Sequence, residues 1–485
     1  MPAGRALGGS ELLEDGSLVG RLLRHWRRRE PVRQLRGVDG RWIASDELEQ
    51  MTRDRAMRLA ASGLVPGERF LLSAGSSADL VITYIAALRA GLVVVPINPA
   101  YTEAEVQRIV RAAAPAAAAV DDDECARWIN VVAPDIAVLG IDVALRNATA
   151  EQTIDQVGSD DPAVLLYTSG TTGVPKGALL THGNLLASAT AVGLAWRWEP
   201  DDQLLLTLPL FHLHGLGVGL NGTLCAGAAV ELRAGFEVAD VVEHCGHGPT
   251  LFFGVPAMYQ RLAASGRAGA LAPLRLLVSG SAPLPAALAT EIARRTGQIP
   301  LERYGMTETV MLTSNPYDGP RRPGTVGVPL PGVGVRLDGA GEVQVTGPNV
   351  IAGYAQNPAA TAEAFTADGW FRTGDIGELD EHGYLRLVGR SKELIITGGY
   401  NVHPREVEEA IATHPGVEEV AVVGRPSDLW GEEVTAVVVA GRPLDTEELR
   451  AHAALTLAPY KVPKRIEFID ALPRNALGKL VRREL

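Results

Sequence analysis

The hydrophobic pattern of this 485-residue chain alternates short apolar runs with longer stretches rich in Ala, Leu and Arg. Apolar runs such as residues 70–73 and 92–96 have the length of buried strands, and the stretches between them have the length of helices. This alternation over residues 1–160 predicts the opening of an α/β domain. Two further runs, residues 163–167 and 178–180, predict buried strands on either side of a polar segment.

The pattern changes near residue 390. Before it, residues 275–279 predict a strand that ends in a turn of small residues and leads into a helix. Charged residues interrupt the apolar pattern at 390–393, and strand-like runs then resume at residues 394–397, 417–423 and 433–439. We therefore predict an α/β fold with a large N-terminal domain of layered sheets and helices, residues 1–390, and a small C-terminal α+β domain, residues 391–485.

Composition narrows the class of protein. A chain with a net charge of −12 does not favour nucleic acid or an anionic membrane as a general partner. The first 15 residues lack the apolar core of a signal peptide, and the uncharged stretch 204–230 is broken by Pro209 and repeated glycines, so we expect no membrane span. Three scattered cysteines, Cys125, Cys225 and Cys245, indicate neither a disulfide framework nor a thiolate metal site and fit a cytoplasmic location.

The polar segment between the paired strand-like runs is rich in hydrogen-bond donors. From Tyr167 to Gly177 the sequence is Y-T-S-G-T-T-G-V-P-K-G. Glycines allow backbone amides to approach an anion, and hydroxyls and a lysine donate to phosphate oxygens. Pro175 and Gly177 stand where a Walker A loop has its second glycine and its magnesium-binding Ser or Thr. We predict a phosphate-binding loop whose metal ligand lies elsewhere; a plain polar turn is the alternative.

Two later motifs each follow a predicted strand. Residues 280–285 form a turn of small residues before a helix, which is a place where α/β proteins bind flat or anionic ligands. Residues 301–309, L-E-R-Y-G-M-T-E-T, combine an aromatic ring, hydroxyls and a carboxylate. Tyr304 could stack on a base, and Glu308 could supply the missing oxygen ligand for Mg²⁺. A helix-capping Thr–Glu pair is the alternative for Glu308.

Further polar residues are candidates for a ligand site. Asp375, in the turn T-G-D, is of the type that accepts hydrogen bonds from ribose hydroxyls. His212 and His214 point to opposite faces if their segment is extended, so we expect one of them to line a pocket rather than both to bind a metal. Lys479 is close to the C-terminus, where a lysine is usually just solvated, so a functional role for it can be argued only together with the other motifs.

Taken together, these motifs resemble those of the acyl-adenylate-forming superfamily, which includes acyl-CoA synthetases, firefly-type luciferases and the adenylation domains of peptide synthetases. The resemblance covers residues from about 50 to 485 and rests on T-S-G-T-T-G-x-P-K-G, Y-G-M-T-E, T-G-D, G-R-x-K-E and P-x-x-x-x-G-K in the family's order. It implies an ATP-dependent acid:CoA ligase that uses ATP, Mg²⁺ and coenzyme A and acts through an acyl-AMP. It also implies that the small domain is mobile between two half-reactions.

The resemblance implies a catalytic set of four residues. Thr168 and Lys176 belong to the loop that grips the β- and γ-phosphates of ATP, Glu308 binds Mg²⁺, and Lys479 bridges the substrate carboxylate and the α-phosphate. A carboxylate that attacks phosphorus brings two anions together, so the reaction needs cations and positioning more than a proton-transfer group.

The implied nucleotide and coenzyme set is larger. Asp375 and Arg390 contact the ribose, and Lys392 lies at the interdomain hinge. Three residues approach coenzyme A when the small domain rotates: Gly398, Gly399 and Tyr400. The remaining members surround the phosphates and the adenine: Ser169, Gly170, Thr171, Thr172, Gly173, Ser279, Gly280, Ser281, Ala282, Pro283, Arg303, Tyr304, Gly305, Met306 and Thr307.

Residues 301–319, followed by R-P-G-T-V-G, most resemble malonyl-CoA synthetases, in which the equivalent region ends similarly in S-N-P-Y-x-G. A dicarboxylate needs a cation for its distal carboxylate, because a buried unpaired carboxylate is costly. We expect Arg261 to supply that cation, with solvent exposure as the alternative. The substrate set is completed by His212, Ser279 and Met306.

Other functions stay open at this point. Val310 and Met311 differ from the malonyl enzymes, so the acid could be a medium-chain fatty or aromatic monocarboxylate. The acceptor could be a carrier protein in place of coenzyme A. A non-enzymatic nucleotide-binding protein is the third alternative, although it would not require Lys176, Glu308 and Lys479 together. The expected partners are small molecules, and the oligomeric state is left open.

Overall fold

The computed structural model describes residues 16–28, 30–144, 153–168, 176–427, 429–474 and 480–485. The chain forms two compact units: Met1–Val335 with Val345–Phe371, and Arg336–Gln344 with Arg372–Leu485. The boundary predicted near Arg390 to Lys392 lies inside the second unit, because strand pairing joins residues 372–390 to residues 336–344.

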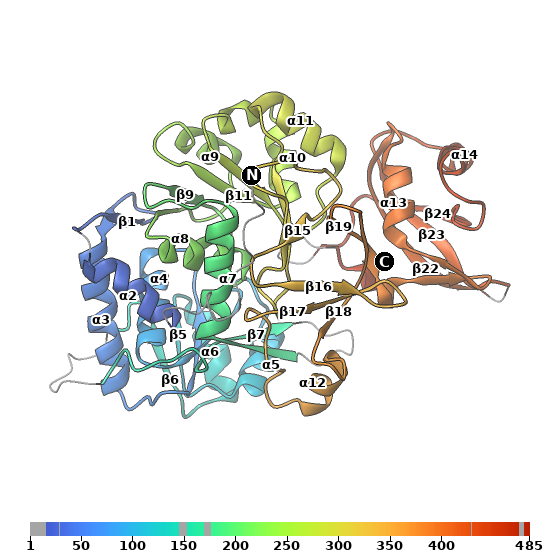
Figure 1. Cartoon of the computed structure of the whole chain (residues 1–485). Helices are drawn as coiled ribbons and strands as arrows, with labels where there is room; N and C mark the ends of the chain where they lie inside the picture. The colour runs from blue at the N-terminus through green and yellow to red at the C-terminus, as the bar shows by residue number, and fades with distance from the viewer. Residues whose placement is uncertain (1–15, 29, 145–152, 169–175, 428, 475–479) are drawn as a thin grey trace. The chain divides into compact units, whose positions relative to one another are not determined.

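A six-stranded sheet of the first unit includes β7, the strand that precedes the predicted phosphate loop in the sequence (Figure 1). Its strand order is β6-β5-β3-β4-β7-β8, and only β7 and β8 pair antiparallel. The inner strands are mostly apolar because helices cover a parallel sheet on both faces. The apolar runs predicted as strands are confirmed. The strands are β3 (Arg69–Ser73), β4 (Val93–Pro96), β5 (Ala117–Val120), β6 (Ala137–Gly140), β7 (Pro162–Thr168) and β8 (Lys176–Thr181).

A nine-stranded sheet of the same unit carries the two later motifs. Its order is β15-β14-β13-β12-β11-β9-β10-β1-β2, and β12 and β13, which precede the motifs, are parallel. The strands are β1 (Arg33–Arg36), β2 (Trp42–Ala44), β9 (Gln203–Leu206), β10 (Ala229–Leu232), β11 (Leu251–Gly254), β12 (Leu276–Ser279), β13 (Leu301–Tyr304), β14 (Thr313–Ser314) and β15 (Val328–Pro329).

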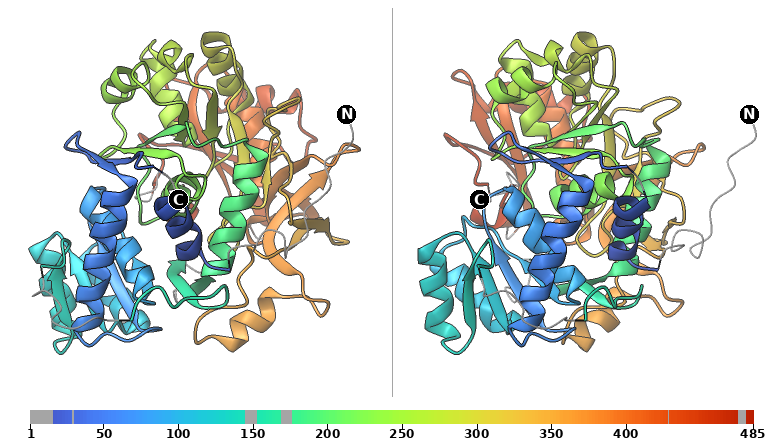
Figure 2. Two further views of the ribbon diagram at one scale, coloured as in Figure 1. Left: turned by 60° about the vertical axis from the view of Figure 1, so that its left-hand side comes forward. Right: turned by 90° about the vertical axis from the view of Figure 1, so that its left-hand side faces the viewer.

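Helices pack on these sheets through apolar side chains. Val106 and Ile129, from α5 and α6, join the core of the six-stranded sheet, and Tyr259 and Ile292, from α10 and α11, join that of the nine-stranded sheet. Helix α2, dark blue in Figure 2, lies against α3 and α7. The helices are α2 (Leu18–Arg28), α3 (Ser45–Ala61), α4 (Ala78–Arg89), α5 (Glu103–Ala113), α6 (Asp123–Val132), α7 (His182–Ala195), the π-helix η1 (His214–Asn221), α8 (Gly222–Cys225), α9 (Val238–His244), α10 (Pro256–Ala264), the 3₁₀-helix η2 (Ala268–Leu271), α11 (Ala286–Thr296) and α12 (Pro358–Ala364).

The second unit is an α+β arrangement, as predicted. A four-stranded sheet, β16-β17-β18-β19, is followed by a five-stranded sheet packed against α13 and α14. Its elements are β16 (Gly334–Leu337), β17 (Glu342–Thr346), β18 (Phe371–Leu379), β19 (Leu385–Arg390), η3 (Ser391–Glu393), β20 (Ile395–Thr397), β21 (Tyr400–Val402), α13 (Pro404–Ala412), β22 (Val417–Ser427), β23 (Gly431–Ala440), α14 (Thr446–Ala454), β24 (Arg465–Phe468) and η4 (Arg482–Glu484). Within the described ranges, no helix is both long and apolar enough to cross a membrane.

Candidate nucleotide and acyl site

The β7–β8 hairpin presents the donor-rich loop. Thr168 pairs with Lys176 across the hairpin, so the two residues that flank the loop are fixed by the backbone ladder. Five predicted loop residues lie outside the described part of the chain: Ser169, Gly170, Thr171, Thr172 and Gly173. The Lys176 Nζ lies 5.3 Å from the ring centroid of Tyr354, within the range of a cation–π interaction.

Tyr354 also holds the predicted metal ligand. Its hydroxyl donates to the Oε1 of Glu308 at 2.9 Å, and Glu308 is only 6% exposed. Burial, and then the charge of Glu308, raise the pKa of the Tyr354 phenol, so the phenol stays protonated and able to donate. One side chain therefore contacts both the lysine at the loop and the carboxylate of the Y-G-M-T-E motif.

The backbone around Tyr354 ties the same two motifs together. The amide of Ile351 donates to the carbonyl of Glu308 at 2.9 Å, and the amide of Ala355 donates to the carbonyl of Gly177 at 2.8 Å. The Nδ2 of buried Asn349 donates to the carbonyls of Thr309 and Met311 at 2.8 and 2.7 Å. Residues 349–355 thus form a strap that fixes the Glu308 segment against the hairpin, which the sequence analysis missed because the contacts join distant positions.

Two non-glycine residues with left-handed backbone conformation lie in or directly after the predicted motifs. Val310 has φ 55° and is buried, and Ser281 has φ 68°. A left-handed conformation costs roughly 1–2 kcal/mol for such residues, so neighbouring contacts must impose it. A Cβ at Gly305 would collide with the Val310 carbonyl, which explains the glycine of Y-G-M-T-E.

The two histidines do not lie on an extended segment, because η1 begins at His214. The His212 Nδ1 accepts from the His214 amide at 3.1 Å, and the His214 Nδ1 lies 3.1 Å from the Ser281 Oγ. The His214 ring stacks on Phe253, with centroids 6.5 Å apart. His214 is thereby placed beside the turn that follows β12, while His212 is half-buried at the start of η1.

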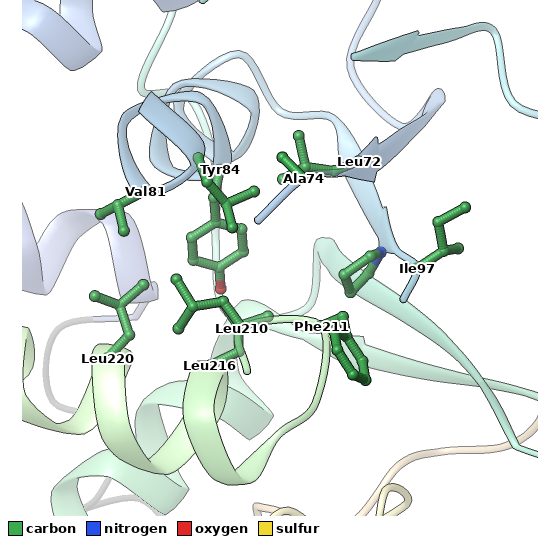
Figure 3. Close-up of a pocket in the computed structure, with 11 residues that line it drawn as sticks. Leu72, Ala74, Val81, Tyr84, Ile97, Leu210, Phe211, Leu216 and Leu220 are labelled. Atoms are coloured by element: carbon green, nitrogen blue, oxygen red, sulfur yellow. The ribbon is translucent and has the colours of Figure 1, made fainter. Parts of the chain in front are cut away.

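An apolar cavity lined by residues of η1 and α4 is too small for a substrate. Tyr84 points from α4 toward Leu210 and Leu216 (Figure 3) and accepts a hydrogen bond from Asn221 at 2.9 Å. The cavity holds about 10 Å³, roughly the space of one water molecule. The hydrogen bond between Tyr84 and Asn221 anchors η1, which begins at His214, to α4.

Two predicted site residues on the nine-stranded sheet are buried. Ser279 is fully buried and Arg303 is 6% exposed. Ser279 is opposite Glu302 in the β12–β13 register, and the Glu302 Oε1 accepts from the Leu284 amide at 2.9 Å. Ala282 and Pro283 are exposed, whereas Tyr304 is buried and Met306 and Thr307 are half-buried. The adenine and substrate roles of these residues stay predictions.

Arg261 lies at the surface of α10. Tyr259 and Leu262 are the buried residues of this helix, and Arg261 projects away from them with 53% of its side chain exposed. Its Nη2 lies 3.1 Å from a carboxylate oxygen of the exposed Glu237. In this structure Arg261 is therefore exposed and paired with a surface carboxylate, and its role as the cation of an acyl pocket stays a prediction.

The second unit holds the predicted ribose residues. Asp375 and Arg390 are opposite each other on β18 and β19, and the Arg390 Nε lies 3.0 Å from the Asp375 Oδ1. Lys392 is exposed in η3. Gly398 and Gly399 have positive φ angles of 56° and 83°, and the exposed Tyr400 stacks on Tyr460 with ring centroids 4.5 Å apart. Lys479 lies outside the described residues.

The residues present fit a magnesium–nucleotide ligand. Mg²⁺ is characteristically held by one or two protein carboxylates and by phosphate oxygens and water. Glu308 offers one buried carboxylate, of which Oε1 is oriented by Tyr354.

Comparisons with known proteins agree with this chemistry. Residues 23–355 match the AMP-binding enzyme family, and residues 406–479 match the AMP-binding enzyme C-terminal domain. The chain is 35% identical to a malonate–CoA ligase from Arabidopsis thaliana, over 87% of this chain and 78% of that protein. It is 38% identical to a feruloyl-CoA synthase from an Amycolatopsis species, over 90% of this chain and 92% of that protein.

The fold is similar to that of ATP-bound MatB from Rhodopseudomonas palustris. The TM-score is 0.91 at 38% sequence identity, and the match covers 96% of this chain and 98% of that one. The chain belongs to the AMP-binding enzyme family and is an AMP-forming acid:CoA ligase that uses ATP, Mg²⁺ and coenzyme A.

Proposed function

We propose that this ligase activates malonate or methylmalonate and releases the corresponding acyl-CoA. The observation that carries the adenylation part is the contact of Tyr354 with both Lys176 and Glu308, which brings a phosphate-binding cation and a metal-binding carboxylate to one place. The choice of acid is supported by the similarity to a malonate–CoA ligase over 87% of this chain.

The first half-reaction joins the acid to AMP. A carboxylate oxygen of the acid attacks the α-phosphorus of ATP, the bond to the β-phosphate oxygen breaks, and pyrophosphate leaves. Lys176 binds the β- and γ-phosphates that depart, and Lys479 holds the attacking carboxylate against the α-phosphate. Bound at Glu308, Mg²⁺ supplies positive charge to the phosphates. Because both reactants are anions, this neutralisation and positioning provide the rate enhancement.

The second half-reaction transfers the acyl group. The sulfur of coenzyme A attacks the acyl carbon, the bond to the AMP oxygen breaks, and AMP leaves while the thiol proton goes to solvent. Asp375 and Arg390 hold the ribose, and the segment of Gly398, Gly399 and Tyr400 meets the coenzyme after the small domain has rotated about Lys392. Rotation of this kind protects the mixed anhydride from water.

An aromatic acid is the second candidate substrate. It is favoured by the 38% identity to a feruloyl-CoA synthase, which covers 90% of this chain. We also propose a cytoplasmic location, in keeping with three cysteines that are buried and unbonded.

Acid-dependent exchange of labelled pyrophosphate into ATP, without coenzyme A, tests the proposal. We expect malonate and methylmalonate to support faster exchange than acetate, octanoate, benzoate or ferulate. Faster exchange with ferulate would indicate that the substrate is an aromatic acid. No exchange with any acid would refute the adenylation step.

A further inference from the structure

Asp375 lies between two irregularities of β18. Gly374, directly before it, has a φ of 71°, and a Cβ at Gly374 would meet no atom within 4 Å, so the backbone angle rather than crowding requires glycine. After Asp375, the register with β19 shifts between Ile376 and Gly377. A flexible glycine and a bulge do not by themselves fix the direction of the side chain between them. The position of Asp375 must therefore be fixed by contacts from another segment.

The start of β17 supplies contacts on both sides of Asp375. The Oε1 of Glu342 accepts a hydrogen bond from the Gly374 amide at 3.2 Å. The carbonyl of Gly341 accepts one from the Gly377 amide at 2.9 Å. These two consecutive residues thus hold the backbone before and after the predicted ribose ligand.

A third contact comes from the next residue of β17. The hydroxyl of Thr373 donates to the Val343 carbonyl at 2.7 Å and accepts from the Asp375 amide at 3.1 Å. Gly341 and Val343 both contribute backbone carbonyls, which any residue would offer. Glu342 contributes its side chain, so the contact to the Gly374 amide is the one that depends on which residue stands there.

The Glu342 carboxylate is itself held in place. Its Oε2 accepts from the Arg372 Nη1 at 3.0 Å, and the Glu342 amide donates to the Asp338 Oδ1 at 2.9 Å. Only 16% of the Glu342 side chain is exposed. A hydrogen bond from an amide to a carboxylate is stronger than one between neutral groups. Glu342 is therefore an oriented, partly shielded and strong acceptor for the Gly374 amide.

The ribose contact expected of Asp375 is sensitive to position. Asp375 is 5% exposed, and the Arg390 Nε lies 3.0 Å from its Oδ1. Hydrogen bonds weaken steeply as their angles depart from linearity, and a displacement of about 1 Å in a binding group can cost on the order of 100-fold in rate. Contacts that fix the backbone beside Asp375 therefore influence how well it meets two ribose hydroxyls.

We propose that Glu342 is a positioning residue for ribose recognition, which acts through Gly374 on Asp375 and thereby sets the preference for nucleotides with a complete ribose. The inference rests on the proposed function, in which Asp375 holds the ribose. Glu342 itself does not touch the nucleotide in this assignment. It lies 32 positions before Gly374, so the sequence gave no reason to connect the two.

The test measures the dissociation constants of ATP and of 2′,3′-dideoxy-ATP, which lacks both ribose hydroxyls, by calorimetry with Mg²⁺. No acid or coenzyme A is present, so the result does not depend on which acid is the substrate. Glu342→Ala removes the acceptor, and Glu342→Gln keeps an oxygen for the Gly374 amide. Glu378→Ala is the matched control, because it removes a carboxylate of β18 whose side chain is 66% exposed.

We expect the ratio of the two constants, dideoxy-ATP over ATP, to fall roughly 10-fold in Glu342→Ala. Glu342→Gln should recover most of that ratio, and Glu378→Ala should leave it unchanged. A purely structural role for Glu342 would weaken the binding of both nucleotides equally and leave the ratio at its wild-type value, which would overturn the inference.

Asp375→Asn separates this inference from the proposed function. If the ratio is close to one in wild type, or unchanged in Asp375→Asn, the ribose role of Asp375 fails and that of Glu342 fails with it. If the ratio falls in Asp375→Asn and not in Glu342→Ala, only the role of Glu342 is overturned. If Glu342→Ala does not fold, Glu342→Asp decides, because it keeps the charge and shortens the reach to Gly374; an unchanged ratio there would refute the assignment.

Discussion

Replacing Tyr354 by Phe isolates one hydrogen bond at the centre of the site. The change removes the hydroxyl that donates to Glu308 at 2.9 Å and keeps a ring beside Lys176, whose Nζ lies 5.3 Å from the ring centroid. Glu308 is buried, so solvent cannot readily replace the lost donor. The effect should therefore appear in how the carboxylate is oriented rather than in the cation–π contact.

The expected size of the effect follows from the negative charge of Glu308, which accepts the hydrogen bond. A hydrogen bond to a charged group contributes about 1.5–3 kcal/mol, which corresponds to a change of roughly 10- to 150-fold. We expect Tyr354→Phe to lower kcat/KM for ATP within this range and to raise the Mg²⁺ concentration needed for half-maximal rate. Pyrophosphate exchange measured across a Mg²⁺ titration gives both values.

Tyr84→Phe is the matched control. It also removes a buried tyrosine hydroxyl, but that hydroxyl accepts from Asn221, the last residue of η1. The control should lower the free energy of unfolding and leave the Mg²⁺ dependence unchanged. Unaltered ATP kinetics and Mg²⁺ dependence in Tyr354→Phe would refute the proposal that Tyr354 orients a carboxylate that binds Mg²⁺.

Three further changes probe the rest of the account. Lys479→Ala should abolish adenylate formation while ATP still binds by calorimetry, and undiminished acyl-AMP would contradict the catalytic role of this lysine. Asn349→Ala should cost about 2–4 kcal/mol of unfolding free energy, because two buried carbonyls lose their donor; a change below about 0.5 kcal/mol would contradict the strap. Burial lowers the pKa of His182 from 6.5 to about 4, so the neutral ring stabilises the fold fully above about pH 6.5. That contribution, up to about 3 kcal/mol, is lost as the pH falls from 6.5 toward 4. Denaturant unfolding at pH 7 and 4.5 should show a smaller drop in His182→Gln than in wild type, and equal drops would contradict the assignment.

The hydrophobic pattern of the sequence predicted strands of the first unit, because a strand that is buried on both faces is apolar along most of its length. The strands that flank the phosphate loop were expected at residues 163–167 and 178–180, and β7 and β8 span Pro162–Thr168 and Lys176–Thr181. Continuous apolar runs bounded by turn residues identify such strands without knowledge of their neighbours.

Long-range contacts carry no such signature. Tyr354 and Glu308 are 46 positions apart, and no short-range pattern links a tyrosine after Gly353 to a carboxylate in another motif. Arg261 was expected to face a pocket, yet the apolar pair of Tyr259 and Leu262 shows that a different face of α10 packs on the sheet. That amphipathic pattern was available in the sequence and could have predicted that Arg261 is exposed.

The face of the sheet that Arg303 occupies could be determined only from the register of β13. Leu301, Glu302, Arg303 and Tyr304 are all buried, so the alternation that normally separates core from solvent gives no indication of which face meets a ligand. The pairing of β13 with β12 shows which face Arg303 occupies, and two nitrogens of its guanidinium have no hydrogen-bond partner within the described part of the chain.

The most direct test of the central claim is mass spectrometry of the thioesters formed from an equimolar mixture of malonate, methylmalonate, acetate, octanoate, benzoate and ferulate with ATP, Mg²⁺ and coenzyme A. We predict malonyl-CoA or methylmalonyl-CoA as the dominant product, formed together with one AMP and one pyrophosphate per thioester. A dominant monocarboxylate thioester would contradict the dicarboxylate site, and an absence of any thioester would contradict the ligase chemistry itself.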